Sequence, residues 1–168
     1  MLVEDTNSGY EFFSALSADN QQTVISAEGN SGVFKKLLEL DSSESCLVIA
    51  DGAAFGSEID RVMKLIQDAD NVILYLPESF EWLILMSGLI DGTRIHEILD
   101  NTENHILSEK YFSWEQYFTA LLIDETKDTY LSYSKKRLNP VYLHEVEKDK
   151  IVKAMDKIGD LFFYDSKK

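Results

Sequence analysis

Acidic side chains follow several apolar runs of this chain. Glu4 and Asp5 follow the first run, Asp51 follows a longer run near the middle of the chain's first half, and Glu78 follows the next. Carboxylate oxygens are the ligands that Mg²⁺ and Mn²⁺ prefer, and Mg²⁺ typically takes one or two of them together with waters and substrate phosphates. The other role for such an acid is to cap the following helix, where the helix dipole favours a negative charge. We favour this second role for Glu78 and keep both roles open for Glu4 and Asp51.

The segment Cys46–Ala50 is the pattern around which the rest of the chain is organised. Its five apolar residues run unbroken and are followed by Asp51 and Gly52. A short continuous apolar run that ends at turn residues is typical of a strand buried on both faces. A helical period follows at once over residues 59–66. Asp51 is therefore predicted to lie at the carboxyl end of a buried parallel strand, which is the edge where open α/β sheets bind ligands.

The first ninety residues contain four apolar runs, and a helical period follows each of them. The predicted strands end near Glu4, Ser26, Asp51 and Leu76. This alternation predicts an α/β fold with a Rossmann-like, parallel four-stranded sheet, helices on both faces and right-handed crossovers. If the strand order is 2-1-3-4, the first and third strands are neighbours. Glu4, Asp5 and Asp51 then converge on one edge of the sheet.

Beyond residue 92 the pattern changes to helices. A helix predicted over residues 78–90 is apolar nearly all round, so it needs protein contacts on several sides. Ser113 and Gln116 have the spacing of a capping box that opens a later helix with an aromatic stripe. We therefore expect residues 1–92 to form an α/β domain and residues 93–168 to form a mainly helical extension of the same globular unit.

The charge of the chain is strongly negative, with a net value of −14. Residues 1–100 carry 18 acidic and 5 basic side chains, whereas residues 101–168 carry 12 and 11. A surface that binds nucleic acid directly is basic, so we expect nucleic acid to bind only through a metal ion. The acidity also suits a basic protein partner. The one basic cluster, Lys135-Lys136-Arg137, is typical of a solvated face.

Other sequence features narrow the class of protein. The single cysteine, Cys46, falls inside the central apolar run and is predicted to be a small buried hydrophobic residue. The first predicted strand already begins at Met1, and no apolar run reaches the roughly 20 residues of a membrane-spanning helix. We therefore expect a soluble, cytoplasmic protein that does not contact a membrane.

Several motifs of other enzyme classes are absent from the sequence. It contains no GxxxxGK phosphate loop, no GxGxxG after the first predicted strand, no GxSxG elbow and no Cys/His spacing for zinc. The three histidines, His96, His105 and His144, are scattered through the second half and are more typical of surface or capping residues than of catalysts.

Two short motifs resemble those of a known family. Leu2-Val3-Glu4 has a glutamate at the end of the first predicted strand, and residues 49–56 place Asp51 and glycines at the end of the third. On these residues, and on Gly29 after the second strand, the first ninety residues resemble a Toprim domain. This is the metal-dependent fold of primases, topoisomerases and overcoming-lysogenization-defect nucleases. The resemblance does not extend to residues 93–168.

The chain departs from the Toprim pattern at one position. The family has an Asp-x-Asp motif, and Ala53 stands where its second aspartate would be. A two-metal clamp for phosphoryl transfer would therefore lose a ligand. Either Glu78 or Asp5 supplies the missing oxygen, or the site is degenerate.

Three functions remain open at this point. The resemblance implies an Mg²⁺-dependent phosphodiesterase or nuclease, in which Glu4 is a general base or metal ligand and Asp51 is a metal ligand of weakly bound Mg²⁺ or Mn²⁺. The second is a catalytically degenerate Toprim-like module that binds protein. The third is a receiver-like switch that is phosphorylated at Asp51. A receiver needs a lysine after a fifth strand, and this sequence has no lysine between Lys64 and Lys110.

Overall fold

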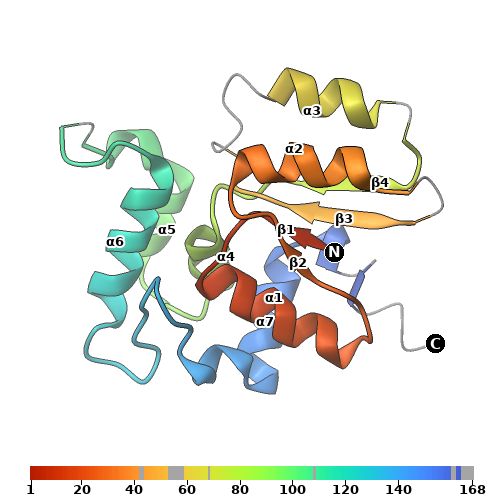
Figure 1. Ribbon diagram of the computed structural model, residues 1–168. Coiled ribbons are helices and arrows are strands. Elements are labelled where there is room, and N and C mark those ends of the chain that lie inside the picture. Colours follow the sequence, from red (N-terminus) through yellow and green to blue (C-terminus); the bar gives the residue numbers. More distant parts are fainter. Residues whose placement is uncertain (42–43, 53–58, 68, 108, 160–161, 164–168) are drawn as a thin grey trace.

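The computed structural model describes residues 1–41, 44–52, 59–67, 69–107, 109–159 and 162–163. Within these residues the chain alternates strands and helices and then continues as helices (Figure 1). The elements are β1 (Leu2–Val3), α1 (Ser8–Asp19), β2 (Ile25–Ser26), α2 (Asn30–Glu39), β3 (Cys46–Ile49), α3 (Ile59–Ile66), β4 (Val72–Tyr75), α4 (Phe80–Met86), α5 (Thr93–Asp100), η2 (Thr102–Asn104), α6 (Trp114–Thr126), η3 (Pro140–Leu143), α7 (Glu145–Ala154) and α8 (Lys157–Gly159).

The four strands form one parallel sheet in the order β2-β1-β3-β4. This is the order in which the first and third predicted strands are neighbours, and each strand ends within two residues of the predicted position. β1 lies between β2 and β3, with Leu2 opposite Ile25 on one side and opposite Val48 on the other. The central position of β1 and its pairing with β3 place the acids that follow these two strands on the same edge of the sheet.

Side chains alternate between the two faces of the sheet, and each face has its own core. Leu2 and Val48 belong to an apolar cluster with residues of α2 and α3, whereas Val3, Leu47 and Ile49 belong to a larger cluster on the opposite face. Figure 1 shows this arrangement: α2 and α3 cover one face, and α1 and α7 cover the other. The sheet is therefore enclosed on both faces, as the apolar run of β3 predicts.

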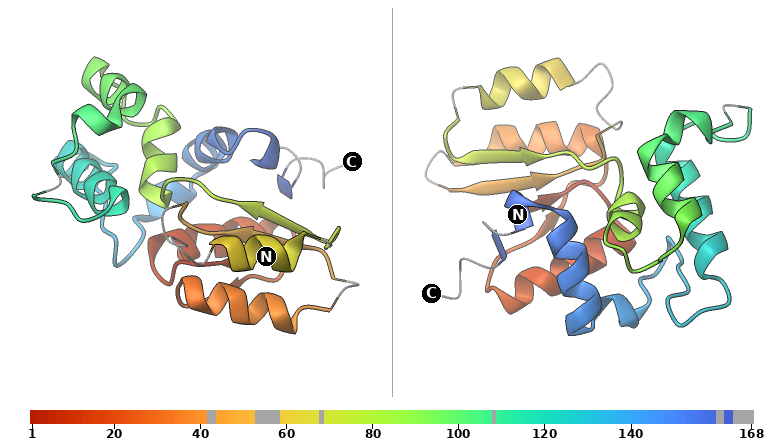
Figure 2. Two further views of the ribbon diagram at one scale, coloured as in Figure 1. Left: turned by 90° about the horizontal axis from the view of Figure 1, so that it is seen from above. Right: turned by 180° about the vertical axis from the view of Figure 1, so that it is seen from behind.

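The helical extension packs onto the α/β part through the larger cluster. Phe12 and Leu83 of the first half share this cluster with Phe118, Tyr142 and Ile151 of the second, and all five side chains are fully buried. Figure 1 shows that the strands point toward α4, α5 and α6, and Figure 2 shows α5 and α6 to one side of the sheet in two further views. The extension thus covers the space beyond the carboxyl ends of the strands.

The helix predicted over residues 78–90 is shorter than expected, because capping residues fix where it begins and where it ends. The Ser79 hydroxyl accepts a hydrogen bond from the Trp82 N–H at 3.1 Å and so begins α4 at Phe80. Gly88, with a φ of 68°, lies just beyond its end. In the part of the chain that the structure describes, we find no helix long and apolar enough to cross a membrane.

Phe118 tests how far the extension stabilises the sheet. Because its ring is fully buried in the shared core, we expect Phe118→Ala to lower the free energy of unfolding by about 3–5 kcal/mol. Phe112, six residues earlier, is 88% exposed, so Phe112→Ala is the matched control and should change it by less than about 0.5 kcal/mol. Urea denaturation of both variants measures the difference, and equal effects would contradict a shared core.

Candidate functional site

Glu4 and Asp51 lie together at the carboxyl ends of β1 and β3, as the sequence predicts. The Asp51 N–H donates to Oε2 of Glu4 at 3.2 Å. The main chain of Glu4 is fixed on both sides, because its N–H donates to the Ile49 carbonyl at 2.9 Å and its carbonyl accepts from the Gly29 N–H at 3.1 Å. Two neighbouring segments therefore fix the main chain of Glu4, and its carboxylate contacts Asp51, the second residue after β3.

The space beside this pair is small and largely apolar. A cavity of about 10 Å³ adjoins both acids, which is roughly the space of one water molecule. Its walls are Val3, Glu4, Asp5, Gly9, Phe13, Ile49, Ala50, Asp51, Pro77, Phe80 and Leu83. The rings of Phe13 and Phe80 lie 5.9 Å apart between centroids, in an edge-to-face arrangement. The two half-buried acids thus border a partly apolar wall.

This environment raises the pKa of both acids. Burial raises the pKa of Asp51 to about 8, and the negative charges of Glu4, Glu115 and Glu81 contribute to the rise. Burial also raises the pKa of Glu4, although the hydrogen bond from the Asp51 N–H lowers it in part. Lys135 is the cation that lowers the pKa of both groups. At neutral pH the Asp51 carboxyl consequently holds a proton, which a divalent cation can replace.

Asp5 has a capping role at the start of α1. Its Oδ1 accepts from the N–H groups of Thr6 at 2.7 Å and Asn7 at 3.0 Å, and its Oδ2 accepts from the Gly9 N–H at 2.9 Å. A Cβ on Gly9 would lie 2.8 Å from Oδ2, so glycine permits this close approach. Both carboxylate oxygens of Asp5 are therefore engaged, and a metal-binding role for it stays a prediction.

Two further sequence positions, Glu78 and Ala53, enter the predicted metal site. Glu78 is half-buried between β4 and α4, and its role as a ligand also stays a prediction. Ala53 lies outside the described residues, as does the rest of its motif up to residue 58. In the described segments, no group of three or more His, Cys, Asp or Glu side chains is placed to hold a metal ion. The described residues thus bring Glu4 and Asp51 together, and their role as metal ligands stays a prediction.

A second group of polar side chains lies next to this pair and comes from the extension and α4. The Lys135 ammonium lies 3.5 Å from Oε1 of Glu81 and forms an ion pair with Oε1 of Glu115. The Tyr133 hydroxyl donates to Oε1 of Glu81 at 2.8 Å. The Glu81 side chain is only 2% exposed, so Lys135 and Tyr133 take the place of water around its carboxylate.

Two helix starts with the same sequence pattern present the two glutamates. α4 begins with Ser79-Phe80-Glu81, and α6 begins with Ser113-Trp114-Glu115. In each case the serine hydroxyl caps the helix by accepting a main-chain N–H, which comes from Gln116 at 3.2 Å in α6. α4 and α6 pack against each other. Glu81 and Glu115 therefore occupy equivalent positions in two adjacent first turns.

The main chain of Lys135 is attached to the start of α1. The Ser8 hydroxyl lies 2.8 Å from the Ser134 carbonyl oxygen and 2.7 Å from that of Lys135, and it donates to this pair of acceptors. Ser8 is fully buried and lies three residues after Asp5. The loop after α6 is thus held beside the acidic edge from which β1 leads into α1.

The sequence did not predict this second group. The assignment of Lys135 to a solvated face is wrong, because its side chain is 33% exposed and pairs with two acids. Lys135 is separated from Glu81 by 54 residues and from Glu115 by 20, so no local pattern connects them. The repeated Ser-aromatic-Glu pattern is the one signal in the sequence that relates Glu81 to Glu115.

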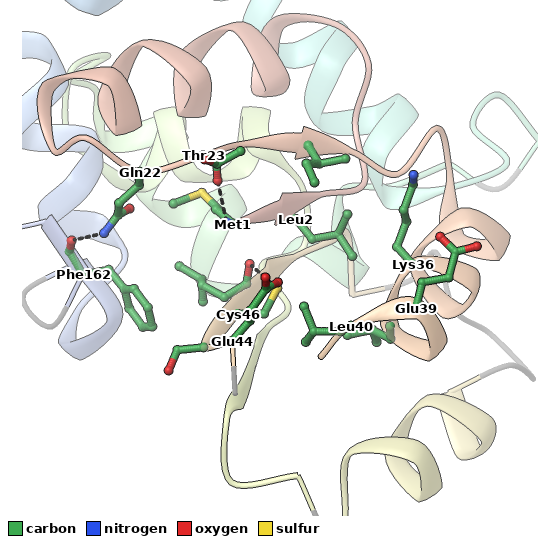
Figure 3. Close-up of a pocket in the computed structure, with 14 residues that line it drawn as sticks. Met1, Leu2, Gln22, Thr23, Lys36, Glu39, Leu40, Glu44, Cys46 and Phe162 are labelled. Carbon is green, nitrogen blue, oxygen red and sulfur yellow. Dashed lines mark hydrogen bonds between the residues drawn. The ribbon is translucent and has the colours of Figure 1, made fainter. Parts of the chain in front are cut away.

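A larger cavity lies at the opposite end of the strands. Its volume is about 810 Å³, and its walls include Met1, Leu2 and Cys46 at the amino ends of β1 and β3 (Figure 3). The Met1 amino group donates to the Thr23 carbonyl at 2.7 Å at its rim. Burial raises the pKa of the Cys46 thiol, in keeping with the buried hydrophobic role predicted for it. This cavity and the Glu4–Asp51 pair are separate features.

No family model, curated protein or solved structure matches this chain. The chemistry of the chain is therefore inferred from its own residues and their geometry.

The raised pKa of Asp51 predicts an unusual dependence of stability on pH. Because the folded protein keeps this proton up to about pH 8 while the unfolded chain loses it near pH 4, stability falls as the pH rises between these values. In EDTA, the free energy of unfolding should drop by about 3–4 kcal/mol between pH 5 and pH 8. Urea denaturation at a series of pH values measures this slope.

Two variants isolate the contribution of Asp51. Asp51→Asn cannot titrate, so its stability should vary much less over this range and exceed that of the wild type at pH 8. Asp128→Asn removes the same charge from an exposed position and should keep the wild-type slope. A wild-type slope in Asp51→Asn would show that another group causes the pH dependence.

Proposed function

We propose that the Glu4–Asp51 edge binds Mg²⁺ or Mn²⁺ weakly, and that the chain is a Toprim-like, metal-dependent phosphodiesterase or nuclease. The observation that supports this most directly is the hydrogen bond from the Asp51 N–H to the Glu4 carboxylate across two parallel strands. Neighbouring strands lie about 4.8 Å apart, so carboxylates at their ends are within reach of one ion. The raised pKa of both acids adds a driving force, because a cation relieves their repulsion.

Each residue of the pair has a role in this proposal. Glu4 and Asp51 hold the ion, and Glu4 is positioned either as a ligand or as a general base. The Asp51 carboxyl releases its proton when the ion binds, so binding tightens as the pH rises toward 8. A bound Mg²⁺ would supply Lewis-acid stabilisation of the charge on a phosphate. Phe13 and Phe80 form part of the wall of the cavity beside the pair.

The charge of the chain restricts its substrates and partners. Residues 1–100 are strongly acidic, so phosphate groups of a nucleic acid approach this edge only when a divalent ion is bound. The same acidity suits a basic protein as a partner. We also propose that the protein acts in the cytoplasm.

The position of Lys135 favours a second candidate, a receiver-like switch phosphorylated at Asp51. The sequence argument against it was the missing lysine after a fifth strand. Lys135 supplies a cation to this edge from the loop after α6, and its charge acts on Asp51 directly. Incubation with acetyl phosphate followed by mass spectrometry distinguishes the two candidates. Addition of one phosphoryl group to the wild type, and none to Asp51→Asn, would support the switch.

Metal binding and hydrolysis test the first proposal together. We expect the wild type to bind Mn²⁺ and to hydrolyse bis(4-nitrophenyl) phosphate or a single-stranded oligonucleotide in its presence. Asp51→Asn and Glu4→Gln should each weaken Mn²⁺ binding by about tenfold or more, because each removes one of two ligands. Isothermal titration and paramagnetic broadening measure the binding, and thermal melts confirm that the variants fold.

Asp128→Asn is the matched control for loss of one exposed charge, and it should bind Mn²⁺ like the wild type. If Glu4→Gln and Asp51→Asn also bind like the wild type, the two acids are structural and the metal-dependent proposal is wrong. Mn²⁺ binding without hydrolysis of either substrate would instead support the degenerate, protein-binding module.

A further inference from the structure

The main chain of β4 is paired on one side only. β4 is the outermost strand of the sheet, and its neighbour is β3 (Figure 1). The Asn71 carbonyl accepts from the Cys46 N–H at 2.8 Å, and the Tyr75 carbonyl accepts from the Ala50 N–H at 3.2 Å. Because successive residues direct their main-chain groups to alternate sides of a strand, those of Leu74 point away from β3. Among the described residues, no group donates to or accepts from the main chain of Leu74.

The side chains of this edge are apolar and incompletely covered. Val72, Leu74 and Leu76 pack on the cluster beneath α2 and α3, and Ile73 and Tyr75 pack on the larger cluster of the opposite face. All five are half-buried, whereas every residue of β3 is buried. A strand added beside β4 would cover apolar surface on both faces of the sheet and would pair the outward main-chain groups.

β4 lacks the features that usually protect an edge strand, which are charges, proline or a very short length. The other edge strand, β2, has only two residues. β4 has four, and none of them is charged or a proline. No lysine or arginine occurs between Lys64 and Arg94. The edge that the described residues of β4 form is therefore suited to strand addition, in which main-chain hydrogen bonds give affinity and side-chain contacts give specificity.

Two acids determine which strand fits this edge. Asp70, which is exposed, lies two residues before β4, and Glu78 lies three residues after it. If the β4 strands of two copies paired antiparallel with their Leu74 residues opposite each other, Asp70 of each copy would lie opposite Glu78 of the other. Like charges in opposite positions destabilise a pair of strands, so self-association is disfavoured. A partner strand with a basic residue at each end would place opposite charges there.

We propose that the outer edge of β4 is a docking site for an extended segment of another protein, with apolar side chains at its centre and a basic residue at each end. The segment adds a fifth strand to the sheet and exchanges hydrogen bonds with the main chain of Leu74. Its basic ends lie beside Asp70 and Glu78 in either strand direction. This inference does not rest on the proposed metal binding by Glu4 and Asp51.

Labelled peptides test the proposal in EDTA, so that a bound metal ion plays no part. The probe is a short acetylated peptide of alternating valine and threonine with a lysine at each end. One control peptide has glutamate in place of both lysines, and the other has N-methylated central residues that cannot pair with a strand. Fluorescence anisotropy should show that the lysine peptide binds at least about tenfold more tightly than either control.

Hydrogen exchange followed by NMR locates the bound peptide without any change to the protein. The Leu74 N–H points away from β3, so its exchange should slow by at least about tenfold when the lysine peptide is bound. The Ile73 N–H points toward β3 and should be protected with and without the peptide. Ile73 is therefore an internal control for opening of the sheet.

Three variants test the main-chain and charge contributions. Leu74→Pro removes an N–H that faces away from β3, so it should keep the fold, which thermal melts check, and bind the lysine peptide at least about tenfold more weakly. Asp70→Lys should bind the lysine peptide more weakly and the glutamate peptide more tightly. Asp128→Lys makes the same charge change at an exposed position after α6 and should behave like the wild type.

The peptide and exchange results decide the proposal even if Leu74→Pro does not fold. Preference for the lysine peptide together with slowed exchange at Leu74 supports it. Absence of binding, equal binding of the N-methylated peptide or unchanged exchange at Leu74 overturns it. A wild-type dimer in sedimentation experiments that protects the Leu74 N–H without peptide would also overturn it, because a second copy would then cover this edge. Metal binding by Glu4 and Asp51 is measured without peptide, so the two proposals succeed or fail separately.

Discussion

Two half-buried carboxylates held side by side are the constraint on which the rest of this structure depends. Glu4 and Asp51 meet because β1 and β3 are adjacent parallel strands, and the Asp51 N–H fixes their contact at 3.2 Å. The apolar wall beside them raises the cost of their charges, as the pKa of about 8 for Asp51 indicates. Such a pair needs a proton, a cationic side chain or a metal ion to neutralise its charge. The surrounding elements differ in which of these they supply.

The helical extension supplies the cation. α6 brings Glu115, the loop after it brings Lys135 and Tyr133, and α4 brings Glu81 from the α/β part. A buried ion cluster of this kind is often no more stabilising than well-packed apolar side chains of the same size. Stability of the fold is therefore a weak explanation for it. The position of the cluster next to the Glu4–Asp51 pair is the better explanation, because its charges act directly on both acids.

Much of the fold could be predicted from local patterns in the sequence, but the site could be predicted only in part. The apolar runs and the helical periods that follow them predict the parallel sheet and the strand ends, whereas the strand order, which places Glu4 beside Asp51, entered only as a condition. Lys135 could not be predicted, because its contacts with Glu81 and Ser8 span 54 and 127 residues. Such contacts depend on how the extension packs, and periodicity carries no information about that packing.

The ends of the helices could also be predicted only in part from the sequence. The sequence gives Ser113 and Gln116 the spacing of a capping box, and the Ser113 hydroxyl does accept from the Gln116 N–H. The Gln116 side chain, however, accepts from the N–H of Phe112 rather than from that of Ser113. α4 likewise begins at the predicted proline-containing turn but later than expected, at the residue after Ser79. Local signals thus determine that a helix begins, and hydrogen bonds of individual side chains determine where.

Glu4 and Asp5 have different roles in the structure, although they follow the same strand. The two acids are adjacent in sequence, but Glu4 contacts β3 whereas Asp5 contacts the first turn of α1. If Asp5 turned toward an ion, α1 would lose a cap worth about 1 kcal/mol, and three main-chain N–H groups would lose their acceptor. Gly9, whose missing side chain admits Asp5, adds to the preference for capping. Asp5 is therefore committed to α1, and the charge that compensates the neighbouring acids Glu81 and Glu115 comes from Lys135 in the extension.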